Sequence, residues 1–318
     1  GGGIYIAENG SFAMTGGAVS NNTTAHGDGG GVCVSGSSAR FTMKDAAYIT
    51  PSSAGEENQP RKNDVYLHDG AKITLSAALT GTAPAARITV AQTQYKSTTQ
   101  VLDGSAVGSE HGKFAVTPNG SDVWKVNKHG MLFLNTATVS GSASEKWKKL
   151  KEAVAAIGDG GTIIIDGMVQ STSAGGNNGE IIIDKDLTIE AKTGTATLDA
   201  NESAFSTGED KHRIFRVKDG KTLTLKNLTL KNGKKAGGNG GGIYSEGTLT
   251  LENTNIEGCT ATNGGAISNR GTLSITGGTF SKNTATSDGG AIYSNSGTVT
   301  LNNAVIGGTS AADANKAQ

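Results

Sequence analysis

Short strings of alternating apolar and polar residues recur along this chain about every 25 residues. In the final third, each string reads Gly-Thr-apolar-(Thr or Ser)-apolar, and a third apolar residue follows five positions later. The clearest copies begin at Gly247, Gly271 and Gly297, and the same frame of apolar positions fits strings that begin at Leu223, Phe12 and Phe41. Alternation marks a strand with one buried face, and a fixed period of about 20–50 residues marks a solenoid. The pattern therefore predicts short strands stacked in successive coils.

One repeat is long enough to form a complete coil of a parallel β-helix. Each repeat contains about three short strands separated by Gly, Asn, Asp or Ser, and a strand advances about 3.3 Å per residue. Coils stacked about 4.7 Å apart would pair in parallel and align equivalent apolar residues inside. Two inner ladders are predicted, one of Leu225, Leu251, Ile275 and Leu301, the other of Leu230, Ile256, Phe280 and Ile306. The predicted fold class is all-β, a parallel β-helix.

Two kinds of turn residue accompany the repeat. Gly-Gly-(Gly or Ala)-apolar strings suit sharp corners, because glycine adopts positive φ. They begin at Gly1, Gly29, Gly240, Gly264 and Gly289. Three residues after the third apolar position stand Asn22 and Asn283, where the other repeats carry Cys259, Thr309, Gly233 or Pro51. An asparagine at this position can hydrogen-bond turn backbone between coils. Because the column is interrupted, we expect the two asparagines to act in their local turns.

One amphipathic helix is predicted near residues 143–157. Ser142 and Glu145 have the spacing of a capping box, and Gly158 is a helix stop. The apolar face consists of Trp147, Leu150, Val154 and Ile157, and the remaining surface carries Lys146, Lys148, Lys149 and Lys151. An open solenoid end exposes apolar residues and strand edges, so we expect this helix to cap a coil. Its lysines are expected to face solvent.

The repeat is interrupted in the middle of the chain. Residues 1 to about 50 hold two repeats, residues 51 to about 140 keep apolar runs without the period, and regular repeats resume after the helix. We interpret residues 1–140 as the end of one β-helix unit with an irregular β-rich closing region, and residues 141–318 as a capping helix and a second unit. Loops 51–64 and 171–179 are predicted to project from the coils. The chain opens within a repeat, so we expect it to be a piece of a longer protein.

Composition and charge argue against several classes of function. Lys and Arg number 28, as do Asp and Glu, so no net charge attracts nucleic acid. No apolar run approaches the ~20 residues of a transmembrane segment. Cys33 and Cys259 lie in different repeats and are predicted to be small buried residues. His26 and Asp28 offer two metal ligands without a partner cluster, so we predict no metal or cofactor site.

Two motifs of the last repeats occur together in a known family. Phe280-Ser-Lys-Asn283 is followed by Gly-Gly-Ala-Ile at 289–292, a string that also stands at 264–267. This combination resembles the repeat of the polymorphic outer-membrane protein family, and the resemblance covers roughly residues 1–50 and 215–309. It implies a right-handed β-helix in a bacterial protein that is secreted or exposed at the cell surface or outer membrane. Members are often adhesive, and some are carried by an autotransporter barrel.

Polysaccharide-active enzymes are the main alternative among β-helix proteins. A glycosidase needs two carboxylates about 5–10 Å apart across the scissile bond, and a lyase needs clustered carboxylates for Ca²⁺ with a basic proton acceptor. The best candidates are Asp184, Asp186 and Asp199, with Arg213 and Arg216 nearby in sequence. All three aspartates fall at turns, so we predict no catalytic residues.

Outward threonines give a third alternative. Pairs that flank inward apolar residues recur in four repeats, Thr222 with Thr224, Thr248 with Thr250, Thr272 with Ser274, and Thr298 with Thr300. Flat threonine ranks are typical of ice-binding proteins, although threonine also fills ordinary exposed strands. The interpretation that the sequence favours is a non-catalytic bacterial surface or secreted protein, an adhesin or display stalk. Its expected partner is a protein or glycan on a host or neighbouring cell.

Overall fold

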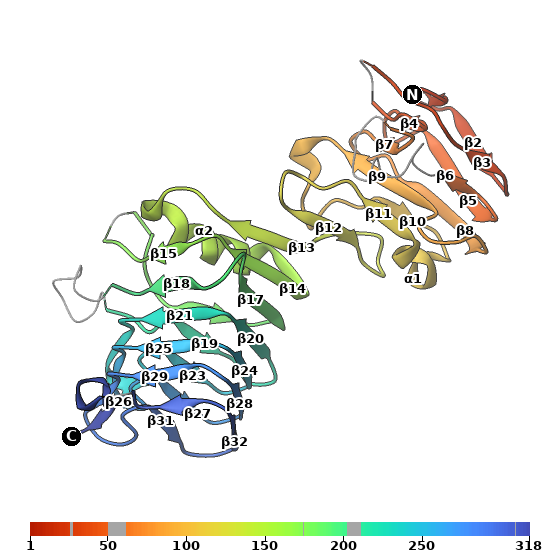
Figure 1. Cartoon of the computed structure of the whole chain (residues 1–318). Coiled ribbons are helices and arrows are strands. Elements are labelled where there is room, and N and C mark those ends of the chain that lie inside the picture. The colour runs from red at the N-terminus through yellow and green to blue at the C-terminus, as the bar shows by residue number, and fades with distance from the viewer. Residues whose placement is uncertain (26–27, 50–61, 174, 202–210, 309) are drawn as a thin grey trace. The chain divides into compact units, whose positions relative to one another are not determined.

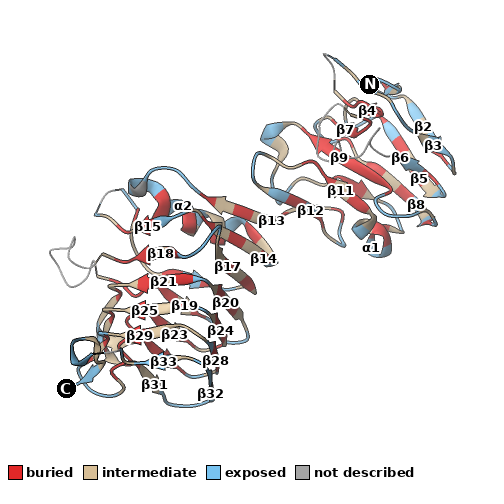
Figure 2. Cartoon of the chain, viewed as in Figure 1, coloured by how far each residue is buried: buried red, intermediate tan, exposed pale blue. Residues whose placement is uncertain are grey.

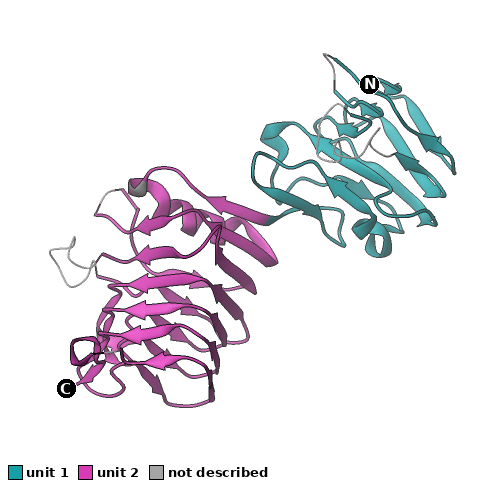
Figure 3. Cartoon of the chain, viewed as in Figure 1, with its two compact units in different colours: residues 1–135 teal, residues 136–318 magenta. Residues whose placement is uncertain are grey.

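The computed structural model describes residues 1–25, 28–49, 62–173, 175–201, 211–308 and 310–318. Its strands stack in parallel coils, which confirms the predicted β-solenoid (Figure 1). The chain divides into two compact units, residues 1–135 and 136–318 (Figure 3). His26, Pro51, Thr309 and most of the predicted 51–64 loop lie outside the described residues.

Unit 1 contains two principal sheets. One follows the order β1 (Ile4–Ile6), β4 (Val32–Val34), β7 (Val65–Leu67), β9 (Ala86–Val90), β6 (Tyr48–Ile49) and β3 (Ala18–Val19), with β11 (Phe114–Val116) also beside β9. The other follows the order β2 (Ser11–Met14), β5 (Arg40–Asp45), β8 (Ile73–Leu79) and β10 (Leu102–Asp103). The remaining elements are η1 (Gln92–Gln94), α1 (Val107–Glu110), η2 (His111–Lys113) and β12 (Val123–Val126), and β13 (Leu132–Val139) contains the division between the units.

The coils of unit 1 continue past residue 50, where the repeat disappears from the sequence. Val32 pairs with Val65 and Phe41 pairs with Ile73, both in parallel register. Leu102 then pairs with Ile73. Parallel pairing between coils therefore continues into the described residues after 61, where the sequence repeat is absent. The period is lost because connections of unequal length join the strands, such as the long stretch between β6 and β7.

Unit 2 is built from four parallel sheets in the part of the chain that the structure describes. The first includes, in order, β14 (Ile157–Ile165), β17 (Leu187–Ala191), β20 (Thr222–Lys226), β24 (Thr248–Glu252), β28 (Thr272–Thr276) and β32 (Thr298–Asn302). The second follows the order β15 (Met168–Gln170), β18 (Ala196–Asp199), β21 (Leu228–Lys231), β25 (Asn255–Glu257), β29 (Thr279–Ser281) and β33 (Val305–Ile306). The third follows β16 (Ile181–Ile183), β19 (Phe215–Val217), β23 (Ile243–Ser245), β27 (Ile267–Asn269) and β31 (Ile292–Ser294). The fourth, which was not predicted, follows β22 (Lys234–Asn239), β26 (Thr260–Asn263), β30 (Thr284–Ala285) and β34 (Lys316–Ala317), and η4 (Ala311–Asp313) precedes β34.

Both predicted inner ladders are present in unit 2, where buried residues line the inside of the coils (Figure 2). Strand register aligns Leu225 with Leu251, Ile275 and Leu301, and Leu230 with Ile256, Phe280 and Ile306. The first three members of each ladder are fully buried, and burial of a Leu or Ile side chain contributes about 1.5–3 kcal/mol. Leu301 and Ile306 are 49% and 44% exposed, because they belong to the last described coil. Apolar stacking therefore stabilises the solenoid coil by coil.

The glycine corners are required by backbone geometry. Gly240, Gly264 and Gly289 each adopt a φ of 65°, a region that favours glycine. A Cβ atom at any of them would overlap the carbonyl oxygen three residues later. The sharp corner before each of β23, β27 and β31 therefore excludes other residues, as the recurring Gly-Gly strings predict.

The helix α2 (Ala143–Ala156) packs against β14, β15 and β16, the strands of the first coil of unit 2. Trp147 and Leu150 are fully buried, and Val154 and Ile157 are nearly so, as the apolar pattern predicts. The helix ends before Ile157, because this residue and Gly158 already belong to β14. The predicted apolar face is confirmed, and the helix ends one residue earlier than predicted.

Two details of α2 differ from the prediction. The Ser142 side chain makes no capping hydrogen bond, and Glu145 instead pairs with Lys149 at 3.5 Å, so the capping box does not form. Lys146 is only 9% exposed, because its Nζ donates to the Asp166 carbonyl oxygen at 2.6 Å. The lysine surface of the helix is therefore partly used to fasten the helix to the first coil.

Candidate functional site

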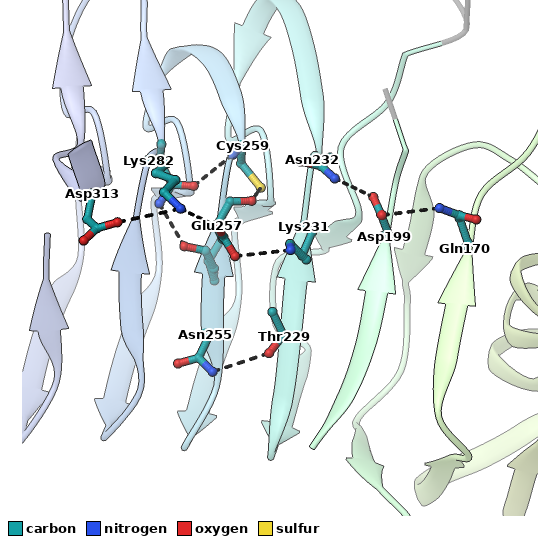
Figure 4. A network of polar contacts seen from close by, with 12 residues as sticks. Gln170, Asp199, Thr229, Lys231, Asn232, Asn255, Glu257, Cys259, Lys282 and Asp313 are labelled. Carbon is teal, nitrogen blue, oxygen red and sulfur yellow. Dashed lines mark hydrogen bonds and ion pairs between the residues drawn. The ribbon is translucent and has the colours of Figure 1, made fainter. Parts of the chain in front are cut away.

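The aspartates considered for catalysis do not come together in one site. Asp184 is exposed after β16, whereas Asp199 ends β18 in a different sheet. Asp199 is 7% exposed and accepts a hydrogen bond from Asn232 Nδ2 at 2.9 Å (Figure 4). Asp186 accepts one from Thr222 N at 2.8 Å. Asp186 and Asp199 therefore join adjacent coils, which is a structural use of their carboxylates.

The described His, Cys, Asp and Glu residues form no group of three that could hold a metal ion. Asp28 lies near one histidine, with 3.9 Å between its Oδ2 and His68 Nε2. Cys33 and Cys259 are both buried, as predicted, and neither forms a disulfide. Of the helices in the described ranges, none combines the length and apolar character that crossing a membrane requires.

Arginine and tyrosine side chains gather on the outer side of the sheet β16–β19–β23–β27–β31. Strand register aligns Arg216 on β19 with Tyr244 on β23, Ser268 on β27 and Tyr293 on β31. These residues alternate with inward apolar residues, so their side chains point away from the core. The guanidinium carbons of Arg213 and Arg216 lie 5.1 and 5.8 Å from the centre of the Tyr244 ring, within the range of cation–π attraction. We name as the Arg–Tyr face the residues Arg213, Arg216, Tyr244, Glu246 and Arg270.

Hydrogen bonds fix the side chains of the Arg–Tyr face in place. Arg216 donates through Nε and Nη2 to Glu246 Oε2, at 3.3 and 3.1 Å. The Tyr244 hydroxyl donates to Glu246 Oε1 at 3.4 Å and accepts from Arg270 Nη1 at 3.2 Å. Arg213 pairs with Glu180, with 2.8 Å between Nε and Oε2. Side chains from three successive coils therefore form one ordered polar surface around a single ring.

The electrostatics of this face favour binding of an anion. Three guanidinium groups and the two carboxylates of Glu180 and Glu246 leave one net positive charge. Burial lowers the pKa of Arg213, although the Glu180 carboxylate opposes this effect. The hydrogen bond to the Tyr244 hydroxyl raises the pKa of the exposed Arg270. Arginine stays protonated at neutral pH, so the three guanidinium groups remain charged.

A second polar surface runs along the sheet β15–β18–β21–β25–β29. Lys231, Glu257, Lys282 and Asp313 alternate in charge from coil to coil, with ion-pair distances of 3.3, 3.1 and 3.7 Å (Figure 4). Burial alone would raise the pKa of Glu257, but the hydrogen bonds and charges of Lys282 and Lys231 hold it below its usual range. Because each charge is paired with a neighbour of opposite sign, we interpret this row as ion pairs between coils rather than as a binding site.

The outward threonine ranks are in register. Thr222, Thr248, Thr272 and Thr298 align in one rank, and Thr224, Thr250, Ser274 and Thr300 align in the next. The adjoining column is charged, with Lys226 and Glu252 paired at 3.1 Å. The sheet therefore offers a narrow hydroxyl and methyl surface across four coils, and the adjoining column is charged in the first two of them and continues as Thr276 and Asn302.

Sequence reasoning noticed Arg213 and Arg216 only as possible partners of the aspartates. The other members of the face, Tyr244, Glu246 and Arg270, were missed. The available signal was the polar or aromatic residue that follows each Gly-Gly-(Gly or Ala)-Ile string, as in Ile243-Tyr244 and Ile292-Tyr293. The spacing of these strings places such residues in one outward column.

No family model, curated protein or solved structure matches this chain. The structure classifies the protein at the level of a parallel β-solenoid fold.

Proposed function

We propose that this chain belongs to a non-catalytic bacterial protein, secreted or exposed at the cell surface, whose solenoid displays a binding face for adhesion. The observation that carries the proposal is the Arg–Tyr face, where Arg216, Tyr244 and Arg270 from three successive coils meet in one ordered surface. The resemblance of the last repeats to the polymorphic outer-membrane protein family supports the location and the adhesive role.

The chemistry of the face favours an acidic glycan as the partner. A guanidinium group binds carboxylate or sulfate oxygens through paired N–H donors. A tyrosine ring adds an apolar surface and a hydroxyl, which suits an amphipathic sugar ring. Arg270 is exposed and hydrogen-bonded only at the Tyr244 hydroxyl among the described contacts of its side chain, so its other N–H groups face solvent. The expected ligand is a uronate-containing or sulfated glycan on another cell.

Substitution at the Arg–Tyr face is expected to weaken this binding. Tyr244→Ala and Arg270→Ala should each raise the Kd about tenfold or more, which corresponds to about 1.4 kcal/mol. Surface plasmon resonance on immobilised uronate-containing, sulfated and neutral glycans would measure the change. Arg40→Ala, an exposed arginine of unit 1, is the matched control and should leave the Kd unchanged. Equal weakening by Arg40→Ala, or no binding to any acidic glycan, would contradict the proposal.

The enzyme alternative has a separate test. Incubation of the full chain with uronic-acid and glucan polymers should release no reducing ends or unsaturated products. Turnover that disappears on Asp199→Ala would overturn the non-catalytic proposal, because Asp199 would then act on substrate rather than on Asn232.

The aligned threonine ranks support ice binding as a second candidate function. Ice recognition needs hydroxyl and methyl groups repeated at regular intervals, and parallel coils about 4.7 Å apart provide such a repeat. If the candidate is correct, the full chain inhibits ice recrystallisation, and Thr250→Tyr abolishes the inhibition because its ring interrupts both ranks. Lys226→Tyr, in the charged column beside them, is the control. Recrystallisation that proceeds unchanged in the presence of the chain would rule the candidate out.

A further inference from the structure

A groove of about 530 Å³ opens on the surface of unit 1. Tyr66 on β7 and Thr89 on β9 line it from the sheet, and Tyr95 lines it from the segment that follows η1. Asp28 and Asp64 reach it from the turns that precede β4 and β7. We refer to this depression as the unit 1 groove. It brings together aromatic rings and polar groups from four successive segments of the chain.

Two tyrosines give the groove its apolar surfaces. The Tyr95 hydroxyl donates to the Thr117 carbonyl oxygen at 2.8 Å, and its ring lies 5.8 Å from the Trp124 ring. Burial raises the pKa of Tyr95 to about 12, so the phenol remains neutral. The Tyr66 ring meets the His68 ring edge-on, with 5.0 Å between their centres. Aromatic rings fixed in a groove with a few convergent polar groups are typical of small-ligand sites.

The carboxylates supply hydrogen-bond acceptors. Asp64 is fully buried, and its Oδ1 accepts from Gly30 N at 2.7 Å. Its Oδ2 accepts no hydrogen bond from any residue in the described ranges, and a buried acceptor left in this state costs about 1–3 kcal/mol. Asp28 offers a second carboxylate, whose side chain is 40% exposed. A ligand rich in hydroxyl donors would pair with the exposed Asp28, whereas the buried Asp64 forms part of the wall beside it.

The balance of charge around the groove argues for a neutral ligand. Arg87 stands beside Asp64 in the strand register, because Val65 pairs with the following residue, Ile88. His68 stands beside Asp28. Asp64 is therefore matched by a guanidinium group, whereas His68 carries a charge only when it is protonated. The groove keeps one unmatched carboxylate, Asp28, which would repel an anionic ligand. A hydroxyl donates to a carboxylate without bringing a charge of its own.

We infer that the unit 1 groove binds a neutral saccharide. Ring hydroxyls donate to the exposed carboxylate of Asp28, and the CH faces of the sugar pack against Tyr66 and Tyr95. This site lies in unit 1 and uses no residue of the Arg–Tyr face, so it stands independently of the function proposed for unit 2.

Isothermal titration calorimetry of the full chain with short neutral oligosaccharides of glucose, mannose, galactose and N-acetylglucosamine tests the inference. At least one series should bind, and Tyr66→Ala and Asp28→Asn should each raise its Kd about tenfold or more. Tyr66→Phe keeps the ring and should bind nearly as the unmodified chain does, which separates loss of the surface from loss of the fold. Tyr48→Ala and Asp69→Asn are controls of the same residue types on exposed positions of unit 1.

The contrary outcomes are equally specific. Absence of binding to every neutral series overturns the inference, as does equal weakening by Tyr48→Ala or Asp69→Asn. A preference for uronate-containing or sulfated oligosaccharides that Tyr66→Ala abolishes would overturn the ligand class. Tyr244→Ala should leave neutral-saccharide binding intact, so failure of the unit 2 proposal and failure of this one can be told apart.

Discussion

Replacement of Trp147 by alanine is expected to lower the free energy of unfolding of unit 2 by about 3–5 kcal/mol, the range for removal of a large buried aromatic side chain. Trp147 is fully buried in the helix that packs on the first coil. Its Nε1 donates to the Gly179 carbonyl oxygen at 2.8 Å, and its ring lies 5.1 Å from that of His212. Burial lowers the pKa of His212, which favours a neutral imidazole against the indole. The substitution would therefore open a cavity beneath α2 and remove a partner from a backbone carbonyl.

Urea unfolding followed by far-ultraviolet circular dichroism measures this effect. Trp147→Phe keeps most of the ring and loses the hydrogen bond, so a smaller loss of about 1–3 kcal/mol is expected. The chain has two tryptophans, and in either variant the fluorescence of Trp124 reports unit 1, whose transition should not move. Lys148→Ala, on the exposed side of α2, is the control and should stay within about 0.5 kcal/mol. A loss below 1 kcal/mol for Trp147→Ala would show that α2 contributes little to the solenoid.

The inner ladders could be predicted because packing repeats in every coil. Leu251 must contact Leu225 on one side and Ile275 on the other, so each position selects an apolar residue independently of turn length. The same logic succeeded for the apolar face of α2. The predicted capping hydrogen bond of Ser142 does not form. The sequence pattern shows that a capping residue is present, but it does not show which hydrogen bonds its side chain makes.

Because the connections between strands differ in length, a fixed count of residues does not find the equivalent asparagine in every coil. Counting three residues from the last apolar position led to Pro51 and Thr309, which lie outside the described residues. The structure instead places Asn63 over Asn22 and Asn315 over Asn283, because extra residues separate them from the strand. Asn283 therefore bridges successive coils, so the expectation of a local turn bond was wrong for this residue. Asn22 does make a local bond, because its Nδ2 donates to the Ser20 carbonyl oxygen at 2.9 Å.

The Arg–Tyr face and the unit 1 groove were not predictable for a different reason. Outward positions are free of core packing, so the repeat that places Tyr244 in an outward column does not show that Arg216 and Arg270 meet its ring. The groove depends on where Asp28 and Tyr95 arrive after connections of unequal length. Sequence spacing cannot supply that geometry, because loop conformation depends on the contacts the loop makes.

Replacement of Asn283 by alanine is the second large effect that we expect in unit 2. Asn283 is fully buried, its Oδ1 accepts from Cys259 N at 3.0 Å, and its Nδ2 donates to the Ile256 carbonyl oxygen at 2.9 Å. Asn315 repeats the arrangement one coil later, accepting from Asn283 N at 3.0 Å and donating to the Phe280 carbonyl oxygen at 2.7 Å. Removal of the side chain should cost about 1–3 kcal/mol for each buried backbone group that loses this partner.

Amide hydrogen exchange measured by mass spectrometry distinguishes a bridge between coils from a local turn. In Asn283→Ala, exchange should accelerate at residues 256–262, in the preceding coil, as well as around the substitution, because the Cys259 N–H loses its acceptor. Asn295→Ala, at an exposed position near the end of the same solenoid, should leave exchange at 256–262 unchanged. Acceleration confined to residues 280–286 would show that the asparagine serves only its own turn. Propagation into both neighbouring coils would make the asparagines, together with the apolar ladders, the elements that keep adjacent coils in register.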